Sequence, residues 1–371
     1  MESDDDERKP AIVIDPGSCF VKAGFAGNFE PNSVFRTCVG YPKSENTFFC
    51  GRDAETKKED LLKLNFPIKQ GVIENWYDME NILHHIFTDE LIVDSSEHNV
   101  TLTQQLMNPK NEKEKWAEIM FETFNVPGLY LVYSTTSSLL SSGKWTGVSI
   151  ELGGQTTQIC PIDDGKPKTY IFEKLYYGGN AITDYLFSLF NYNCKMFYNS
   201  KYKPCMEDIK EKSCYVALDF QDESIFGEPY DYLLPDNEHL IVNEERFKAP
   251  EAIFKPSLIG KEEEGLHQIC NKLIKKFDNE KKKELYNSIN LSGGNSMFNG
   301  LADRLTKEIK ALAEDDFKEE VRVFASPERK YNSWIGASIL SSTLKEKWIT
   351  NEKYEESGFS IFNKEDSLAF K

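Results

Sequence analysis

One short pattern occurs twice in the chain and restricts the fold more than any other feature: an apolar run, an acidic residue, a glycine turn and a second apolar run. The first copy spans Ala11–Phe25 and turns at Asp15-Pro16-Gly17-Ser18, and the second spans Val148–Cys160 and turns at Glu151-Leu152-Gly153-Gly154. Each copy is typical of two strands joined by a tight turn. The acidic residues take equivalent places 136 positions apart. The repeat therefore predicts two similar halves.

Apolar residues with helical spacing follow each copy of the pattern. They predict helices around Met79–Phe87, Trp116–Phe124, Ala181–Phe190, Met206–Leu218 and Leu301–Leu312. The alternation of strands and helices favours an α/β fold with helices packed on sheets. A chain of 371 residues is long enough for two such domains or one large two-lobed fold.

Charge and composition exclude several classes of function. The 61 acidic residues outnumber the 44 basic ones, and a net charge of −17 excludes a general binder of nucleic-acid phosphate, although a local basic patch stays open. The chain has no apolar run of about 18 residues, so we expect no membrane span. Its acidic start is unlike a secretory signal and favours the cytosol or nucleus. The eight cysteines lack C-x-x-C spacing, which favours reduced thiols over a zinc site.

Three glycine turns are candidates for phosphate binding. Besides the turns of the two hairpins, a third runs Leu291–Ser296 between an apolar run and a helical pattern. Glycine lets backbone N–H groups approach a phosphate closely. Lys22 would add positive charge, and Asp15 and Glu151 would hold a hydrated Mg²⁺, which keeps most of its waters. The alternative is that each turn only joins two strands.

The resemblance to a known family rests on six long segments in a fixed order. The chain resembles actin and the actin-related proteins over nearly its whole length. The matching segments are Lys22–Gly27, Phe121–Asn125, Asp208–Lys212, Tyr215–Phe220, Asn290–Gly294, and Pro327–Tyr331 with Trp334-Ile335-Gly336.

The resemblance implies an α/β, ribonuclease H-like fold of two duplicated lobes with a central nucleotide cleft. The outer lobe would contain residues 1–141 and 331–371, with an inserted subdomain at about 37–66. The inner lobe would contain residues 142–330, with an inserted subdomain at about 178–259.

The resemblance also implies the ligands, ATP or ADP with Mg²⁺, and their contacts. Asp15 and Glu151 would face the water shell of the metal. The residues that would hold the nucleotide are Gly17, Ser18, Lys22, Gly153, Gly154, Gly179, Lys210, Glu211, Gly293, Gly294, Met297, Phe298 and Lys330.

Departures from the family pattern gather at the catalytic positions. Ser134 stands where the family has a glutamine that positions the attacking water, and Gln158 stands where it has a histidine. Gly154 replaces an acidic residue, and Pro16 replaces an asparagine and lacks the backbone N–H. These changes around the attacking water predict weakened ATP hydrolysis, against the alternative of neutral variation.

Positions that join subunits in actin filaments also differ. The loop at Lys43–Phe49 is short, Lys261 stands where actin has an apolar plug residue, and the segment between Leu340 and Trp348 is two residues shorter. Trp145 and Lys166 alter the cleft at one end of the subunit. These differences predict poor self-polymerisation.

The residues and the resemblance leave three functions to compare. The first is a structural, cytoskeleton-associated subunit of a larger hetero-assembly, with other actin-fold subunits or protein partners and no direct nucleic-acid contact. The second is a conventional filament-forming actin with ATPase activity. The third is a phosphotransferase of the sugar-kinase type, which needs a carboxylate base that the sequence does not reveal. The cytoplasm is the expected location, with the nucleus or cilium as alternatives.

Overall fold

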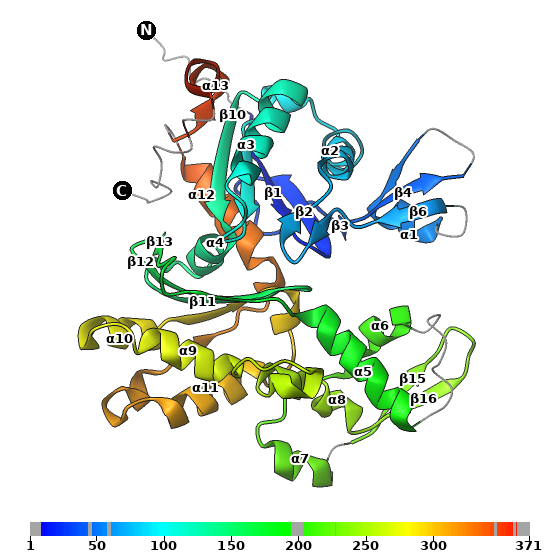
Figure 1. The fold of residues 1–371 in the computed structure, drawn as a ribbon, viewed down its shortest axis with the longest axis vertical. Helices are drawn as coiled ribbons and strands as arrows, with labels where there is room; N and C mark the ends of the chain where they lie inside the picture. Colours follow the sequence, from blue (N-terminus) through cyan, green and yellow to red (C-terminus); the bar gives the residue numbers. More distant parts are fainter. Residues whose placement is uncertain are drawn as a thin grey trace. The chain divides into compact units, whose positions relative to one another are not determined.

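The computed structural model describes residues 9–43, 47–57, 61–193, 203–226, 228–344, 347–358 and 361. The chain divides into two compact units. The first contains Met1–Trp145, Ile162–Thr169 and Tyr331–Lys371, and the second contains Thr146–Pro161 and Tyr170–Lys330. In the colours of Figure 1, most of the first unit is the blue and cyan part of the chain together with its orange and red part. Both ends of the sequence therefore belong to one unit.

The first unit is built on a six-stranded sheet in the order β19-β10-β9-β1-β2-β3. Strands β10, β9 and β1 run parallel, and β2 and β3 continue antiparallel as a meander. The elements of this unit are β1 (Ile12–Pro16), β2 (Phe20–Phe25), β3 (Ser33–Arg36), β4 (Val39–Pro42), β5 (Phe49–Cys50), α1 (Gly51–Thr56), β6 (Leu61–Asn65), β7 (Ile68–Lys69), β8 (Val72–Ile73), α2 (Trp76–His85), η2 (Ile86–Glu90), η3 (Ser95–Glu97), β9 (Val100–Gln104), α3 (Asn111–Glu118), η4 (Ile119–Thr123), β10 (Gly128–Tyr133), α4 (Ser134–Leu140), β13 (Lys166–Pro167), α12 (Asn332–Thr343), β19 (Ile349–Thr350) and α13 (Asn351–Ser357).

Helices cover both faces of this sheet, as the alternation of side chains along β1 requires. Ile12 and Ile14 are fully buried in a cluster with side chains of α2 and α3. Val13 faces the other way, into a second cluster with side chains of α4 and α12. Within that cluster the Trp334 indole N–H donates to the Val13 carbonyl at 2.9 Å. The central strand is thereby buried on both sides, as in other parallel sheets of α/β proteins.

A buried carboxylate joins α2 to the small sheet β5-β4-β6 of the first unit. Asp78 is 1% exposed and accepts hydrogen bonds from the Tyr41 hydroxyl and from Asn65 Nδ2 at 2.8 Å. Asn75, the residue that caps α2, donates to the same carboxylate and accepts from the Asp78 backbone N–H at 3.1 Å. A buried charge needs such partners to be tolerated.

The second unit is built on strands β12, β11, β17 and β18 in that order, with β14 also paired to β12. Strands β11, β17 and β18 are parallel. The elements of this unit are β11 (Gly147–Leu152), β12 (Thr157–Asp163, whose last two residues fall in the first unit), β14 (Glu173–Leu175), α5 (Gly179–Asn193), α6 (Lys203–Ser213), α7 (Phe220–Phe226), β15 (Tyr230–Leu233), β16 (His239–Val242), α8 (Glu245–Lys248), η7 (Pro250–Ile253), η8 (Pro256–Ile259), α9 (Leu266–Ile274), α10 (Asn279–Tyr286), β17 (Ile289–Ser292), η9 (Gly294–Ser296), α11 (Leu301–Leu312), η10 (Asp315–Glu320), β18 (Val323–Phe324) and η11 (Arg329–Tyr331, shared with the first unit).

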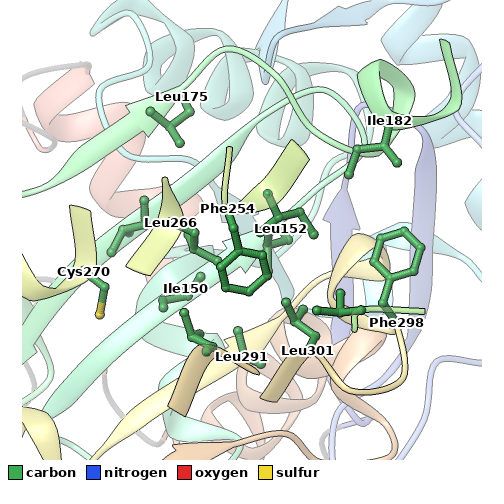
Figure 2. Close-up of a cluster of buried hydrophobic side chains, with 14 of the residues drawn as sticks. Ile150, Leu152, Leu175, Ile182, Phe254, Leu266, Cys270, Leu291, Phe298 and Leu301 are labelled. Carbon is green, nitrogen blue, oxygen red and sulfur yellow. The ribbon is translucent and has the colours of Figure 1, made fainter. Parts of the chain in front are cut away.

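One continuous core holds the second unit together. Figure 2 shows Ile150 of β11 and Leu291 of β17 beside Leu266 and Cys270 of α9 and Leu301 of α11. All five side chains are buried. The regularly spaced apolar residues of α11 are therefore buried, as the sequence predicts, except that Leu312 is 36% exposed at the end of the helix.

Most elements predicted from the sequence are confirmed, and one helix is shorter at its end. Both hairpins are present, and β1 pairs with β2 so that Asp15 lies opposite Lys22. The helix predicted to run to Leu218 ends at Ser213. Beyond it, the Tyr215 N–H bonds to the Arg246 carbonyl and the Val216 N–H to the Asn299 carbonyl, so neither can continue the helix.

The described residues show no group of side chains suited to a metal ion and no helix long and apolar enough to cross a membrane. Seven cysteines carry free thiols, and the eighth, Cys194, lies outside the described residues, as does most of the acidic arm at residues 1–9. Burial raises the pKa of the Cys38 thiol to about 11 and that of Cys270 to about 12.

Candidate functional site in two parts

In the first unit, Asp15 is fixed by two neighbours at the carboxyl end of β1. Lys22 lies opposite it in the hairpin, and its Nζ is 2.8 Å from Asp15 Oδ2. The Thr103 hydroxyl, at the end of the adjacent strand β9, donates to the other carboxylate oxygen. Asp15 is 7% exposed. Ligands of α/β sheets bind beyond the carboxyl ends of the strands, which is where this ion pair lies.

The first glycine turn leaves no room for a side chain. A Cβ at Gly17 would lie 2.7 Å from the Phe20 carbonyl oxygen and 3.5 Å from Lys22 Nζ. The Gly17 N–H bonds to that same carbonyl at 3.1 Å, and the Thr37 hydroxyl donates to the Gly17 carbonyl at 2.6 Å. Ser18 accepts from the Gly71 N–H at 3.2 Å. The turn is therefore held by several hydrogen bonds and has no room for a side chain at Gly17.

Ser134 begins α4, directly after strand β10. Strands β1, β9 and β10 are parallel and adjacent, so Ser134 follows β10 at the same sheet edge as Asp15 and Thr103. The side chain is 3% exposed. A serine hydroxyl reaches less far from this edge than the amide of a glutamine would.

In the second unit, Glu151 lies at the end of β11 in the place that Asp15 takes in the first unit. Its carboxylate accepts a hydrogen bond from Gln158 Nε2 on β12, with the two atoms 3.3 Å apart. Gln158 is 1% exposed. Its amide nitrogen is therefore directed at the carboxylate that we expect to face a metal water.

The second glycine turn is tied to the start of α5. The Gly153 and Gly154 carbonyls accept from the backbone N–H groups of Gly179 and Asn180 at 3.0 and 2.8 Å. Lys210 of α6 reaches the same place. Its Nζ donates to the Gly179 carbonyl at 3.2 Å and to the Thr183 hydroxyl at 2.8 Å, and the residue is 7% exposed. Four of the predicted site residues are thus brought together.

The third turn also belongs to this group. Gly293 has φ 86° and ψ 155°, and a Cβ there would lie 2.4 Å from the Leu152 carbonyl oxygen. The next residue, Gly294, has open space around it. Asn295 is 8% exposed, and its Oδ1 has no hydrogen-bond partner within the described part of the chain. That oxygen would lie 3.1 Å from a Cβ at Gly179. A buried acceptor without a donor beside an open glycine fits a ligand that donates a hydrogen bond.

A pocket of about 440 Å³ adjoins this part of the second unit. Glu211 and Met297 line it, together with Lys212, Tyr215 and Arg246. The Arg246 guanidinium lies over the Tyr215 ring, 5.1 Å from its centroid, and its Nε donates to the Ser213 carbonyl at 2.9 Å. Burial, with a hydrogen bond to Glu223, raises the pKa of Tyr215 to about 12. The charged groups of the pocket are therefore Glu211, Lys212 and Arg246.

Two predicted contacts differ in character from the rest. Phe298 is 8% exposed and belongs to the core of the second unit, whereas Lys330 is exposed. The sequence interpretation missed Thr103, Asn295 and Arg246. Asn295 lies inside the predicted third turn and could have been included, but Thr103 is 88 residues from Asp15 and gives no local signal.

The comparison with protein families identifies the family of the chain. A model of the family described as Actin matches residues 6–366, nearly the whole chain. The match includes both hairpins, the third glycine turn and the pocket residues, and the α/β architecture of both units agrees with the two-lobed actin fold. The chain belongs to the actin family.

Proposed function

We propose that this actin-like, nucleotide-binding chain holds ATP or ADP with Mg²⁺, hydrolyses ATP slowly, and serves as a structural subunit of a hetero-assembly. The observation that carries the proposal is the contact of Gln158 Nε2 with Glu151. By the resemblance to actin, the residues that would bind a nucleotide are kept, while both residues that would activate water are replaced.

Nucleotide binding needs little beyond what the two units provide. In the first unit Gly17, Ser18 and Lys22 would hold phosphate oxygens, and in the second unit Gly153 and Gly154 would do the same. Asp15 and Glu151 would accept hydrogen bonds from water bound to Mg²⁺, which would neutralise phosphate charge. The nucleoside would occupy the pocket at Glu211 and Met297 and would donate a hydrogen bond to Asn295 Oδ1. The other residues expected to contact it are Gly179, Lys210, Gly293, Gly294, Phe298 and Lys330.

Thermal unfolding tests binding directly. We expect Mg-ATP to raise the melting temperature of protein whose own nucleotide has been extracted and identified, because a ligand that binds only the native state stabilises it. A Lys22→Met variant, which removes the cation beside Asp15, should lose most of the rise. An unchanged melting temperature at millimolar Mg-ATP would refute nucleotide binding at this site.

Slow hydrolysis follows from the two substituted positions. Water must be oriented in line with the terminal phosphate, and side chains that orient it act by position and charge. Ser134 is short and buried, and the Gln158 amide donates to Glu151, so it cannot accept a proton as an imidazole can. Loss of one positioning group commonly costs about 10²–10³ in rate.

Single-turnover phosphate release tests this part. We expect the double variant Ser134→Gln, Gln158→His to release phosphate faster than the wild type. The control Ser137→Gln should give no gain, because the Ser137 hydroxyl donates to the Tyr133 carbonyl at the end of β10. If the wild type already hydrolyses ATP as fast as a filament-forming actin, the proposal of a weakened site is wrong.

The surface at Lys261 argues against long homopolymers. Lys261 is partly exposed in the loop after η8, and the next three residues, Glu262, Glu263 and Glu264, are all exposed acids. If a neighbouring subunit buried this loop in a pocket suited to an apolar side chain, these charges would lose their contact with water. That loss is costly unless the pocket supplies groups of opposite charge. Of the short loop Lys43–Phe49, residues 44–46 lie outside the described residues.

Pelleting and electron microscopy with Mg-ATP at physiological salt decide between the two assembly states. We expect no long filaments from the purified chain, and co-purification with a fixed set of partners from the source cell. Regular filaments formed by the chain alone would instead support a conventional actin.

A further inference from the structure

Two helices of the first unit end in the same way. Helix α2 passes into the π-helical turn η2, and α3 passes into the π-helical turn η4. After η2, the Leu91 and Val93 N–H groups bond to the Ile86 and Phe87 carbonyls, both at 2.9 Å. After η4, the residues Phe124 and Val126 make the same two bonds, to Ile119 and Met120, both at 3.1 Å. The two ends therefore share one backbone design.

The residue between the two bonded N–H groups is left-handed in both copies, but its side chain differs. After η4 it is Asn125, with φ 51°, and after η2 it is Ile92, with φ 54°. Asparagine is one of the residues that tolerate this conformation, while for a β-branched side chain it is an outlier. This kind of helix end does not require isoleucine, because the equivalent end after η4 forms with Asn125.

Burial does not explain the isoleucine either. Ile92 is 80% exposed, whereas its neighbours Leu91 and Val93 are partly buried and pack on the core of the first unit. An exposed aliphatic side chain gains nothing from the hydrophobic effect in the isolated protein. The left-handed backbone is thus unfavourable for an isoleucine, and its exposed side chain offsets little of that cost in the isolated protein.

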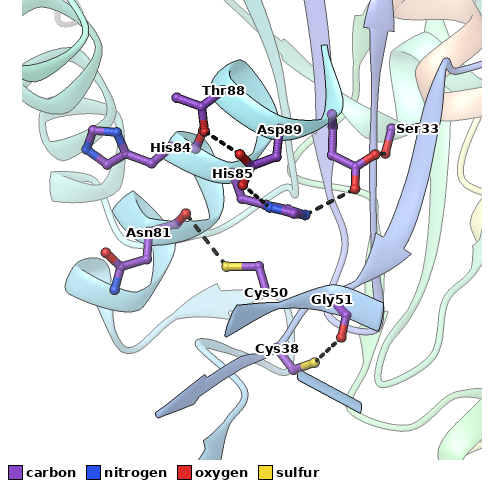
Figure 3. A network of polar contacts seen from close by, with 10 residues as sticks. Ser33, Cys38, Cys50, Gly51, Asn81, His84, His85, Thr88 and Asp89 are labelled. Atoms are coloured by element: carbon purple, nitrogen blue, oxygen red, sulfur yellow. Dashed lines mark hydrogen bonds and ion pairs between the residues drawn. The ribbon is translucent and has the colours of Figure 1, made fainter. Parts of the chain in front are cut away.

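The residues around Ile92 are mostly acidic. Asp89 and Glu90 precede it on η2, and Figure 3 shows Asp89 beside His85, whose Nδ1 is 2.8 Å from Asp89 Oδ2. Glu90 accepts from the Ser33 hydroxyl at 2.6 Å. Asp94 lies two residues after Ile92 and is exposed. Hydrogen bonds from Ser96, and to a smaller extent the charge of Lys9, lower the pKa of Asp94. The sequence thus places carboxylates on both sides of an exposed apolar residue.

We infer that Ile92 is the apolar contact of a docking surface for a protein segment in which an aliphatic or aromatic residue is flanked by lysines or arginines. The bound residue would cover Ile92, and the cations would face Asp89 and Asp94. Complementary charge of this kind raises the association rate and makes it sensitive to salt. The surface is independent of the proposed nucleotide site.

A first experiment tests whether Ile92 is unfavourable in the isolated protein. The variant Ile92→Asn copies the twin helix end, and Asn125→Ile is the reverse exchange. We expect a higher urea midpoint for the first and a lower midpoint for the second. A lower midpoint for Ile92→Asn would show that the isoleucine stabilises the fold, and the inference would be overturned.

A second experiment tests docking with a displayed library of random 15-residue peptides. The library is selected on the whole wild-type chain, with Ile92→Asn as the counter-selection. We expect the selected peptides to contain an apolar residue next to lysine or arginine, and to lose affinity about tenfold or more with Ile92→Asn, as for one lost aliphatic contact. An Asp94→Asn variant should bind more weakly and with less dependence on salt. If no peptide separates the wild type from Ile92→Asn, or if the selected peptides are acidic, the inference is wrong.

Discussion

The two adjacent glycines of the third turn offer a sharp test of how the second unit is built. Replacing Gly293 by alanine puts a Cβ 2.4 Å from the Leu152 carbonyl oxygen and 2.8 Å from its carbon. Its φ of 86° with ψ of 155° is a conformation that only glycine adopts readily. The conformation costs about 1–3 kcal/mol for any other residue. The steric overlap adds about 1–3 kcal/mol more, because the neighbour is backbone and moves little.

We therefore expect Gly293→Ala to lower the free energy of unfolding of the second unit by about 2–6 kcal/mol, a large part of the stability of a typical domain. Gly294→Ala is the matched control. A Cβ there meets no atom within 4 Å, so the change should be neutral or slightly stabilising.

The chain itself supplies an assay that separates the two units. All five tryptophans, at positions 76, 116, 145, 334 and 348, lie in the first unit. In urea, tryptophan fluorescence would therefore follow the first unit alone, and far-ultraviolet circular dichroism would follow both. Gly293→Ala should move only part of the dichroism transition to lower urea. Equal midpoints for the Gly293 and Gly294 variants would refute the reasoning.

Two further predictions concern buried polar groups. Burial lowers the pKa of His267 below its ordinary value of 6.5, so below that pH the unfolded chain binds more protons than the folded chain and stability should fall. In the variant His267→Leu, the urea midpoint should fall less between pH 7 and pH 5 than in the wild type. An unchanged pH profile would contradict this explanation. Tyr41→Phe removes a donor to the buried Asp78 and should cost about 1–3 kcal/mol in urea unfolding. Tyr77→Phe, at a residue 66% exposed, is the control and should change stability by less than about 0.5 kcal/mol. A similar loss in both tyrosine variants would show that the contact with Asp78 is unimportant.

Local patterns in the sequence predict those parts of the fold that local forces determine. The alternation around Asp15 and Glu151 predicts both hairpins because a two-residue period and a glycine turn determine which residues pair. The pairing of Asp15 with Lys22 follows from that register. The apolar spacing of α2 and α3 predicts helices, and their predicted apolar residues are buried.

The sequence could not predict features that depend on distant backbone groups. Helix α6 ends at Ser213 because carbonyls of Arg246 and Asn299 take the next donors. The same periodicity fits an α-helix and a π-helical turn, so η2 and η4 were not foreseen. The left-handed conformation of Ile92 could not be predicted either, because sequence rules expect glycine or asparagine at such a position.

The order in which the chain is made has a consequence for the first unit. Its face at Val13, Tyr130 and Val132 is covered by α12, which begins at Asn332. During synthesis, strands β1 and β10 leave the ribosome long before α12 exists, and at about 5–20 residues per second the gap lasts roughly 10–40 seconds. Through that interval an apolar sheet face stays uncovered, and a nascent chain of this design needs protection from aggregation until α12 has emerged.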